Sequence, residues 1–236
     1  MSAVGWFAGQ GIVAYADQTH VFELRHIEVR GTDILHKAEV IDAMQIPVTG
    51  SIFDVQLDNI QTRLEQLNYV AGVRLGRLFP HTLFVDVVEN QPLAYVAAPE
   101  YYLISMEGLA LPLPHGKFEV ALPTVSGIDN VLECLDKGTI RGHLQLGQAW
   151  EMLANIKSRY PDIYNDLSEM VFDGADGITL YLSKSSTAVR LGTDQLTERI
   201  ALLDAFLKTV RGVQPLEKYA YIDLRYKQQI VVKERV

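Results

Sequence analysis

The sequence lacks the residues that several classes of site and interaction require. It has a single cysteine, Cys134, in 236 residues, which excludes an intrachain disulfide and a zinc site held by cysteines. We interpret Cys134 as a small buried or half-buried thiol. Lys and Arg number 21 against 29 Asp and Glu, and the formal net charge is −8. Because binding to phosphate backbones needs clustered cations, we expect no nucleic-acid partner.

Motifs of nucleotide binding and catalysis are also absent or incomplete. The chain contains no G-x-x-x-x-G-K-[ST], H-E-x-x-H, G-x-S-x-G or S-x-x-K. Residues 9–14, GQGIVA, match G-x-G-x-x-A, but only eight residues precede them, too few for the strand of a dinucleotide-binding unit. The six histidines include no pair at i, i+4 that a helix could present to a metal. We therefore predict no catalytic, cofactor-binding or metal-binding residues.

Two groups of acidic residues leave one enzymatic alternative open. Asp173 and Asp176 lie in the run DGADG, and Asp162, Asp166 and Glu169 flank the end of a predicted helix. Two carboxylates held about 5–10 Å apart could hydrolyse a glycosidic bond. A D-G pair between two predicted strands is also what a hairpin turn requires, and we favour the turn. An envelope glycoside hydrolase remains the less favoured alternative.

Residues 1–16, MSAVGWFAGQGIVAYA, carry no charge. As a helix they would extend about 24 Å, which is less than the hydrocarbon core of about 30 Å. No basic n-region precedes them, so a signal peptide is not favoured. Three interpretations stay open: a packed N-terminal helix, an anchor lying in the interface, and a spanning helix of which only part is present. We favour the third, since Trp6, Phe7 and Tyr15 suit a helix leaving a bilayer.

The region 21–91 has the pattern of a small α+β domain. We expect a strand within 21–30 that stops at Gly31, followed by two amphipathic helices. Two further strands follow, and in the second of them Leu83, Val85 and Val87 share one face. The order strand–helix–helix–strand–strand predicts two helices that cover one face of a three-stranded sheet. The helices are expected within 36–45 and around 57–67, and the later strands over 69–78 and 82–89.

The region 92–236 predicts a mixed β-sheet domain with two helices. Three prolines fall within 112–127, so we expect irregular edge structure there. The longer helix has apolar residues at spacings of 4, 3, 4 and 3 between Leu196 and Val210. Pro161 closes the other helix, which begins near Leu146. Strands are expected over 93–97, 101–105, 109–113, 170–172, 178–182, 188–191, 218–226 and 229–233.

Three segments resemble the FtsQ/DivIB family of bacterial cell-division proteins. Residues 22–31, FELRHIEVRG, resemble the opening strand of a POTRA domain entered from a membrane helix. Residues 77–94, RLFPHTLFVDVVENQPLA, are similar to the family pattern R-x-x-P-x-T-L-x-V-x-V-x-E-x-x-P-x-A, and residues 221–226, YIDLRY, to Y-[IV]-D-L-R-[FY]. The motifs occur in the family's order. Asn90 stands where arginine is usual, and residues 227–229, KQQ, lack the usual glycine, which leaves the geometry of the last hairpin open.

The resemblance implies an α+β protein without catalytic activity. Residues 1–20 would be the remnant of a transmembrane and juxtamembrane segment, 21–91 a POTRA domain and 92–236 the FtsQ-type β domain. We expect a single-pass protein of the inner membrane whose main part lies in the periplasm at the division septum. It would bind the FtsB/FtsL pair and support septal peptidoglycan synthesis, with other division proteins meeting the POTRA domain.

The resemblance also implies a partner-binding site near the C-terminus. In the family, the positions that match Arg225 and Tyr226 contact a strand of FtsB, so Arg225 would pair with a carboxylate and Tyr226 would give an apolar contact. Alternation along the strand would place the two side chains on opposite faces. An open sheet edge leaves N–H and C=O groups for a partner strand. The predicted partner-binding residues are Leu224, Arg225, Tyr226, Ile230, Val231 and Val232.

A second kind of POTRA-containing protein is the alternative to a division scaffold. Components of outer-membrane assembly and secretion also use POTRA domains. They would have repeated POTRA units followed by a long run of barrel strands, whereas this sequence predicts one unit and a short set of strands.

Overall fold

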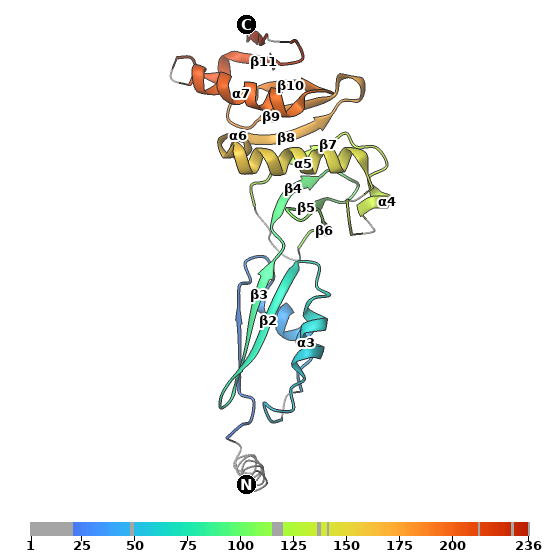
Figure 1. The fold of residues 1–236 in the computed structure, drawn as a ribbon, viewed down its shortest axis with the longest axis vertical. Helices are drawn as coiled ribbons and strands as arrows, with labels where there is room; N and C mark the ends of the chain where they lie inside the picture. Colours follow the sequence, from blue (N-terminus) through green and yellow to red (C-terminus); the bar gives the residue numbers. More distant parts are fainter. Residues whose placement is uncertain are drawn as a thin grey trace, which may run out of the picture. The chain divides into compact units, whose positions relative to one another are not determined.

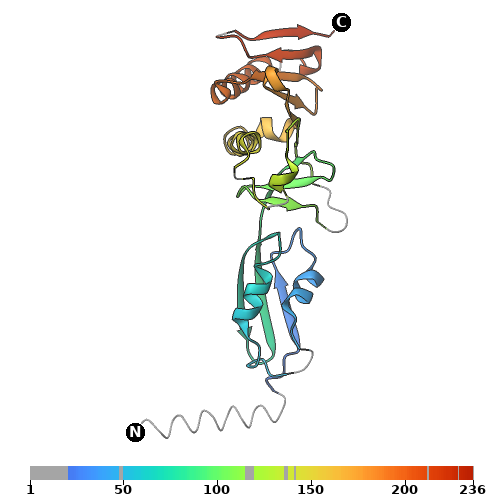
Figure 2. The same ribbon diagram turned by 90° about the vertical axis from the view of Figure 1, so that its right-hand side faces the viewer.

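The structure is a computed structural model that describes residues 21–47, 50–114, 120–135, 138–140, 142–211, 213–227 and 229–235. The chain divides after Asn90 into two compact units, which Figures 1 and 2 show. The predictions for residues 1–20 lie outside the described residues, as does the prediction of a buried thiol for the side chain of Cys134. Within the described ranges, no helix combines the length and the apolar character that a membrane span needs.

The first unit has the predicted order of elements. Its strands form a sheet in the order β1-β3-β2, with β1 parallel and β2 antiparallel to β3. Buried side chains of the two helices, such as Val40 and Leu64, pack against Leu83 and Val85 of the central strand, and both helices lie on one face of the sheet (Figure 2). The POTRA-type arrangement of two helices on a three-stranded sheet is confirmed. The elements are β1 (His26–Arg30), α2 (Lys37–Met44), α3 (Leu57–Leu64), β2 (Val70–Leu78) and β3 (Thr82–Glu89).

The acidic residue of the second family motif ties the end of β3 to the loop before α2. The buried carboxylate of Glu89 accepts hydrogen bonds from the backbone N–H groups of Asp33, Ile34 and Leu35, at 3.0, 2.8 and 2.8 Å. Charge-assisted bonds of this kind are stronger than neutral ones. Asn90, where the family usually has arginine, is buried and donates from its side-chain amide to the Asn68 carbonyl, so the unusual residue is satisfied within the unit.

The second unit is built on one mixed sheet. Its described strands run in the order β12-β11-β10-β9-β8-β7-β4-β5-β6. The pairs β4–β7, β7–β8 and β10–β11 are parallel and the remaining neighbours are antiparallel. The mixed sheet that we predicted is confirmed. The strands are β4 (Pro92–Val96), β5 (Tyr102–Ser105), β6 (Ala110–Pro112), β7 (Thr124–Ser126), β8 (Leu167–Phe172), β9 (Ile178–Leu182), β10 (Ala188–Gly192), β11 (Tyr219–Asp223) and β12 (Val231–Glu234).

Two long helices bury their apolar stripes against this sheet (Figure 1). They are α5 (Leu144–Arg159) and α7 (Leu196–Val210), close to the predicted ranges. The structure adds two short helices, α4 (Leu132–Leu135) and α6 (Pro161–Asp166), so the expected number of two was too low. Helices of four and six residues are too short to produce a recognisable 3.6-residue repeat.

The expectation of irregular edge structure over 112–127 was wrong for its last part. Strand β7 lies inside the sheet, between β4 and β8 and parallel to both, and Val125 is fully buried. Pro123 precedes the strand, and its carbonyl accepts a hydrogen bond from the Tyr95 N–H at 2.9 Å. A proline just before a strand costs no ladder donor, so it is compatible with an interior position.

Candidate partner-binding edge

Strand β12 is the last strand of the larger sheet and has a neighbour on one side. It pairs antiparallel with β11, with Val232 opposite Ile222 and Val231 opposite Asp223, and it ends the strand order of the described residues. Figure 2 shows it as the outermost strand of its unit. All four side chains of β12 are exposed. The strand therefore contributes a row of backbone groups and two accessible faces, and adds little to the core.

The opposite edge of the same sheet is protected. Strand β6 is three residues long and ends at Pro112, which has no N–H to offer. Leu109 forms an antiparallel bridge with Thr139, and the Ala110 N–H donates to the Gly138 carbonyl at 3.2 Å. Short strands, prolines and covering segments are the usual ways to block edge-to-edge pairing. Among the described residues, no comparable proline or covering segment protects the outer edge of β12.

Arg235 fixes the C-terminal end of β12. Its N–H donates to the Lys218 carbonyl at 2.7 Å, and its guanidinium donates to the carbonyls of Ser185 and Ser186, at 2.9 and 2.8 Å. At the other end of the strand, Ile230 is partly buried against the main core. The edge strand is thus held at both ends, which keeps its outward-facing groups in one arrangement.

Strand β11 ends at Asp223, three residues earlier than predicted, so the expected alternation of Arg225 and Tyr226 across a strand does not apply. Leu224 is 1% exposed, and its N–H donates to the Arg190 carbonyl at 2.9 Å. Its side chain belongs to the core and is not available to a partner. Tyr226, in contrast, is 54% exposed, and Val231 and Val232 are exposed on β12.

Arg225 already has carboxylate partners within the chain. Its guanidinium donates to both carboxylate oxygens of Asp223, at 3.0 and 2.8 Å, and to Asp176 at 2.9 Å. Burial alone would raise the pKa of the Asp223 carboxyl, but the hydrogen bonds and charge of Arg225, with the charge of Arg190, hold it below its ordinary value. The hydrogen bond to Asp223 also raises the pKa of Arg225. Arg225 therefore orders the loop after β11.

Arg199 also holds this loop in place, and this role was not predicted from the sequence. The side chain extends from α7, is almost fully buried, and donates to the carbonyls of Leu191 and Arg225 and to Asp194. An arginine in an amphipathic helix is usually solvated, so the helical pattern does not reveal one that is buried. Its contacts link α7 to the segment that carries Tyr226.

Comparison with known families decides the identity of the fold. The family model for a POTRA domain of FtsQ type matches residues 22–90, and the model for the C-terminal part of cell division protein FtsQ/DivIB matches residues 94–225. The chain belongs to the FtsQ/DivIB cell-division family. The C-terminal match ends before β12, so the edge strand lies beyond it.

Relatives of FtsQ type match almost the whole chain. Cell division protein FtsQ of Geotalea daltonii is 29% identical over 99% of this chain and 83% of its own length. The protein of the same name from Syntrophotalea carbinolica is 28% identical over 98% of this chain and 79% of its own length. These alignments extend through both units, so the FtsQ/DivIB resemblance of the three motifs is confirmed.

The carboxylates that left a hydrolase open lie in a turn or have partners within this FtsQ/DivIB chain. Asp173 and Asp176 lie in the turn between the antiparallel strands β8 and β9, as the D-G pattern predicted. Asp176 pairs with Arg225. Glu169 accepts a hydrogen bond from the Ser126 hydroxyl at 2.6 Å. Members of this family are division scaffolds not known as enzymes.

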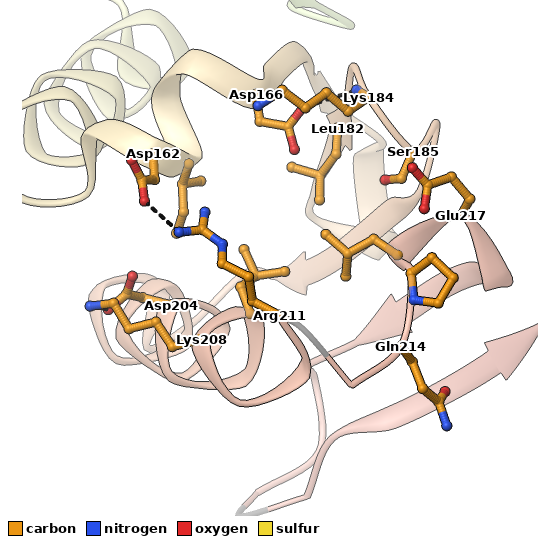
Figure 3. Close-up of a pocket in the computed structure, with 14 residues that line it drawn as sticks. Asp162, Asp166, Leu182, Lys184, Ser185, Asp204, Lys208, Arg211, Gln214 and Glu217 are labelled. Carbon is orange, nitrogen blue, oxygen red and sulfur yellow. Dashed lines mark hydrogen bonds and ion pairs between the residues drawn. The ribbon is translucent and has the colours of Figure 1, made fainter.

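The other two carboxylates line a cavity of about 300 Å³ between α6, α7 and the residues before β11 (Figure 3). Asp162 faces Arg211 across it, with an oxygen–nitrogen distance of 3.0 Å. Asp166 accepts hydrogen bonds from the Ser183 hydroxyl and the Lys184 N–H, at 3.0 and 2.9 Å. A glycosidase needs one protonated carboxyl and one free carboxylate. Here Asp162 forms an ion pair, and Asp166 accepts hydrogen bonds from a loop.

Proposed function

We propose that the chain is a non-catalytic scaffold of the division machinery that pairs the outer edge of β12 with a strand of FtsB. The observation that carries the proposal is the contrast between the two ends of one sheet. Strand β6 is short and covered, whereas β12 has exposed side chains and no neighbour beyond it among the described residues. An open edge invites the addition of a strand.

The backbone of β12 supplies only part of the affinity. In an antiparallel pair, alternate residues direct their N–H and C=O groups to the same side. A strand of four residues thus offers two donors and two acceptors to a partner. At about 1 kcal/mol for each hydrogen bond, these contribute about 4 kcal/mol, which corresponds to a dissociation constant of about 1 mM. Side chains beside the edge must supply the rest, and the exposed candidates are Tyr226, Val231 and Val232.

Charge near the edge favours an acidic partner segment. Residues 215–236 contain five Lys or Arg and three Asp or Glu, in a chain with a net charge of −8. Arg225 is engaged by Asp223 and Asp176, so Lys227 and Lys233, both exposed, are the cations beside β12 that face solvent. Complementary charges at the rim of an interface chiefly raise the rate of association.

The remaining parts of the proposal concern location and assembly. The uncharged segment 1–16 would anchor the protein in the inner membrane as a single pass, with the POTRA domain (21–91) and the β domain (92–236) in the periplasm at the septum. The scaffold would hold the FtsB/FtsL pair there and support septal peptidoglycan synthesis, and the POTRA domain would meet other division proteins. Membership of the FtsQ/DivIB family supports this role.

Two proline variants test the pairing directly. Consecutive residues of a strand direct their N–H groups to opposite sides, so one of Val231 and Val232 donates to β11 and the other faces outward. Proline removes the N–H in either case. Val231→Pro and Val232→Pro are each measured for thermal stability and for binding of an FtsB segment by calorimetry.

The melting temperatures identify which of the two native residues directs its N–H group away from β11. The variant that keeps the native melting temperature has lost an outward N–H, and we expect its affinity for the FtsB segment to fall at least tenfold. The other variant should unfold at a lower temperature because it loses a ladder bond. If the proline variant with native stability binds FtsB as tightly as the native chain, strand pairing at β12 is refuted.

A further inference from the structure

Three phenylalanines gather at one end of the POTRA unit. The ring of Phe53 lies 5.2 Å from Phe22 and 5.4 Å from Phe79, measured between ring centres, and Phe22 lies 6.2 Å from Phe79. Phe79 is 60% exposed, and Phe53, Leu78 and Val21 are also exposed. We call the following five residues the aromatic tip: Val21, Phe22, Phe53, Leu78 and Phe79. Exposed aromatic clusters on a soluble surface mark sites of contact with another apolar surface.

Three separate segments build the aromatic tip, and hydrogen bonds hold them in place. The Ile52 N–H donates to the Phe22 carbonyl at 2.8 Å, which joins the turn after Gly50 to the start of the described chain. The Arg77 guanidinium donates to the carbonyls of Ile52 and Val55, at 2.8 and 2.6 Å. These two bonds join the same turn to β2. The hairpin between β2 and β3 carries Phe79. The tip is therefore a formed surface.

The charged residues beside the aromatic tip carry both signs, and they include Glu23, whose backbone forms a bridge with Ser51. Arg77 is committed to backbone carbonyls, and Asp54 accepts a hydrogen bond from the Ser51 N–H at 3.3 Å. Attraction to anionic groups therefore contributes little, and the tip's chemistry suits an uncharged apolar layer. Phenylalanine and leucine are among the side chains that enter the boundary between lipid headgroups and acyl chains.

The sequence beside the tip indicates which apolar layer lies close to it. Phe22 lies six positions after Ala16, the last residue of the uncharged segment. A fully extended chain covers at most about 3.6 Å per residue, so these two positions are no more than about 22 Å apart. The chain enters the unit at the end of the sheet where the β2–β3 hairpin turns, as both ribbon views show (Figures 1 and 2). If the uncharged segment lies in a bilayer, the tip is held next to its surface.

We infer that the aromatic tip inserts into the lipid interface and seats the POTRA unit on the membrane. This rests on the proposed anchoring of residues 1–16 for its setting, but the tip is a separate contact with lipid. It would limit the directions in which the unit can point from its anchor. The far end of β3 provides a control position away from the tip. Val88 is 62% exposed and lies six residues beyond Thr82, which is about 20 Å along a strand.

A polarity-sensitive fluorophore measures the insertion. The full chain carries Cys134→Ser and one new cysteine, either Phe53→Cys at the tip or Val88→Cys as the control, labelled with a nitrobenzoxadiazole dye. An N-terminal histidine tag holds the chain on phosphatidylcholine vesicles that contain a nickel-chelating lipid. We expect the emission of the dye at position 53 to rise and shift to shorter wavelength on the vesicles, and the dye at position 88 to keep its aqueous spectrum.

Two further arms separate the tip from its alternatives. Leu78→Ser with Phe79→Ser changes only exposed side chains, so the fold should persist, and the shift at position 53 should be lost. Adding phosphatidylglycerol should leave the shift unchanged. A dye at position 53 that keeps its aqueous spectrum on the vesicles, or that responds only when a protein partner is added, overturns the inference.

The anchoring of residues 1–16 is judged by a different measurement. The untagged chain is floated with vesicles that lack the nickel lipid. Failure to float would reject the anchoring in the proposed function, whereas floating without a spectral shift at position 53 would reject the aromatic tip alone.

Discussion

Tyr226 is the side chain that we expect to contribute most to partner binding, because it is the exposed aromatic residue beside β12. Its exposed fraction is 54%. An aromatic side chain presents about 200 Å², so complete burial under a partner would remove about 110 Å² from water. At about 25 cal/mol for each Å², this contributes about 2.7 kcal/mol. Tyr226→Ala should therefore raise the dissociation constant for an FtsB segment about 100-fold.

Titration calorimetry with the full chain measures this change. Tyr101→Ala is the matched control, since Tyr101 is 53% exposed and precedes β5, near the covered edge of the same sheet. Both variants should keep the native melting temperature, because neither side chain is buried. The reasoning is refuted if Tyr226→Ala weakens binding no more than Tyr101→Ala does.

Three other predictions concern stability. The pKa of Asp223 is lowered in the folded chain. The ionised carboxylate therefore stabilises the fold above its ordinary pKa of about 3.9, and this contribution is lost as the pH falls through the lowered value. In urea titrations, the Asp223→Asn variant should lose less stability than the native chain between pH 6 and pH 3. The buried hydroxyl of Ser185 has no hydrogen-bond partner among the described residues, so Ser185→Ala should increase the free energy of unfolding by about 1 kcal/mol, and a decrease would reveal a partner. Gly177 has a φ of +83°, and a Cβ there would overlap the Gly192 backbone, so Gly177→Ala should cost at least about 2 kcal/mol by the same assay, whereas Gly174→Ala, with open space around it, should cost less.

Elements with a strong repeat were predictable, because the repeat directly reflects which face is buried. The apolar spacing from Leu196 to Val210 gave helix α7, and the alternation of Leu83, Val85 and Val87 gave strand β3, at the observed boundaries. Strand β7 was not predictable in this way. It has three residues, and its central place depends on pairing with β4 and β8, which come from distant parts of the chain.

At the candidate site, the contacts of individual residues could not be predicted from the sequence. The open edge was expected near the C-terminus, where β12 lies. Arg225 was assigned to a partner carboxylate, although Asp223, two residues away, is close enough in sequence to have suggested a local pair. The contacts of Leu224 with the core and of Arg199 with the Arg225 carbonyl require the packing of α7 on the sheet, which no local pattern encodes.

Backbone amide exchange, followed residue by residue by nuclear magnetic resonance, tests the central claim most directly. The chain is compared with and without a saturating FtsB segment. Pairing at the outer edge predicts that exchange slows at alternate residues of β12, the ones whose N–H groups face away from β11, while the amides of β6 keep their rates. Unchanged exchange throughout β12, with slowing at another surface of the chain, would contradict the account.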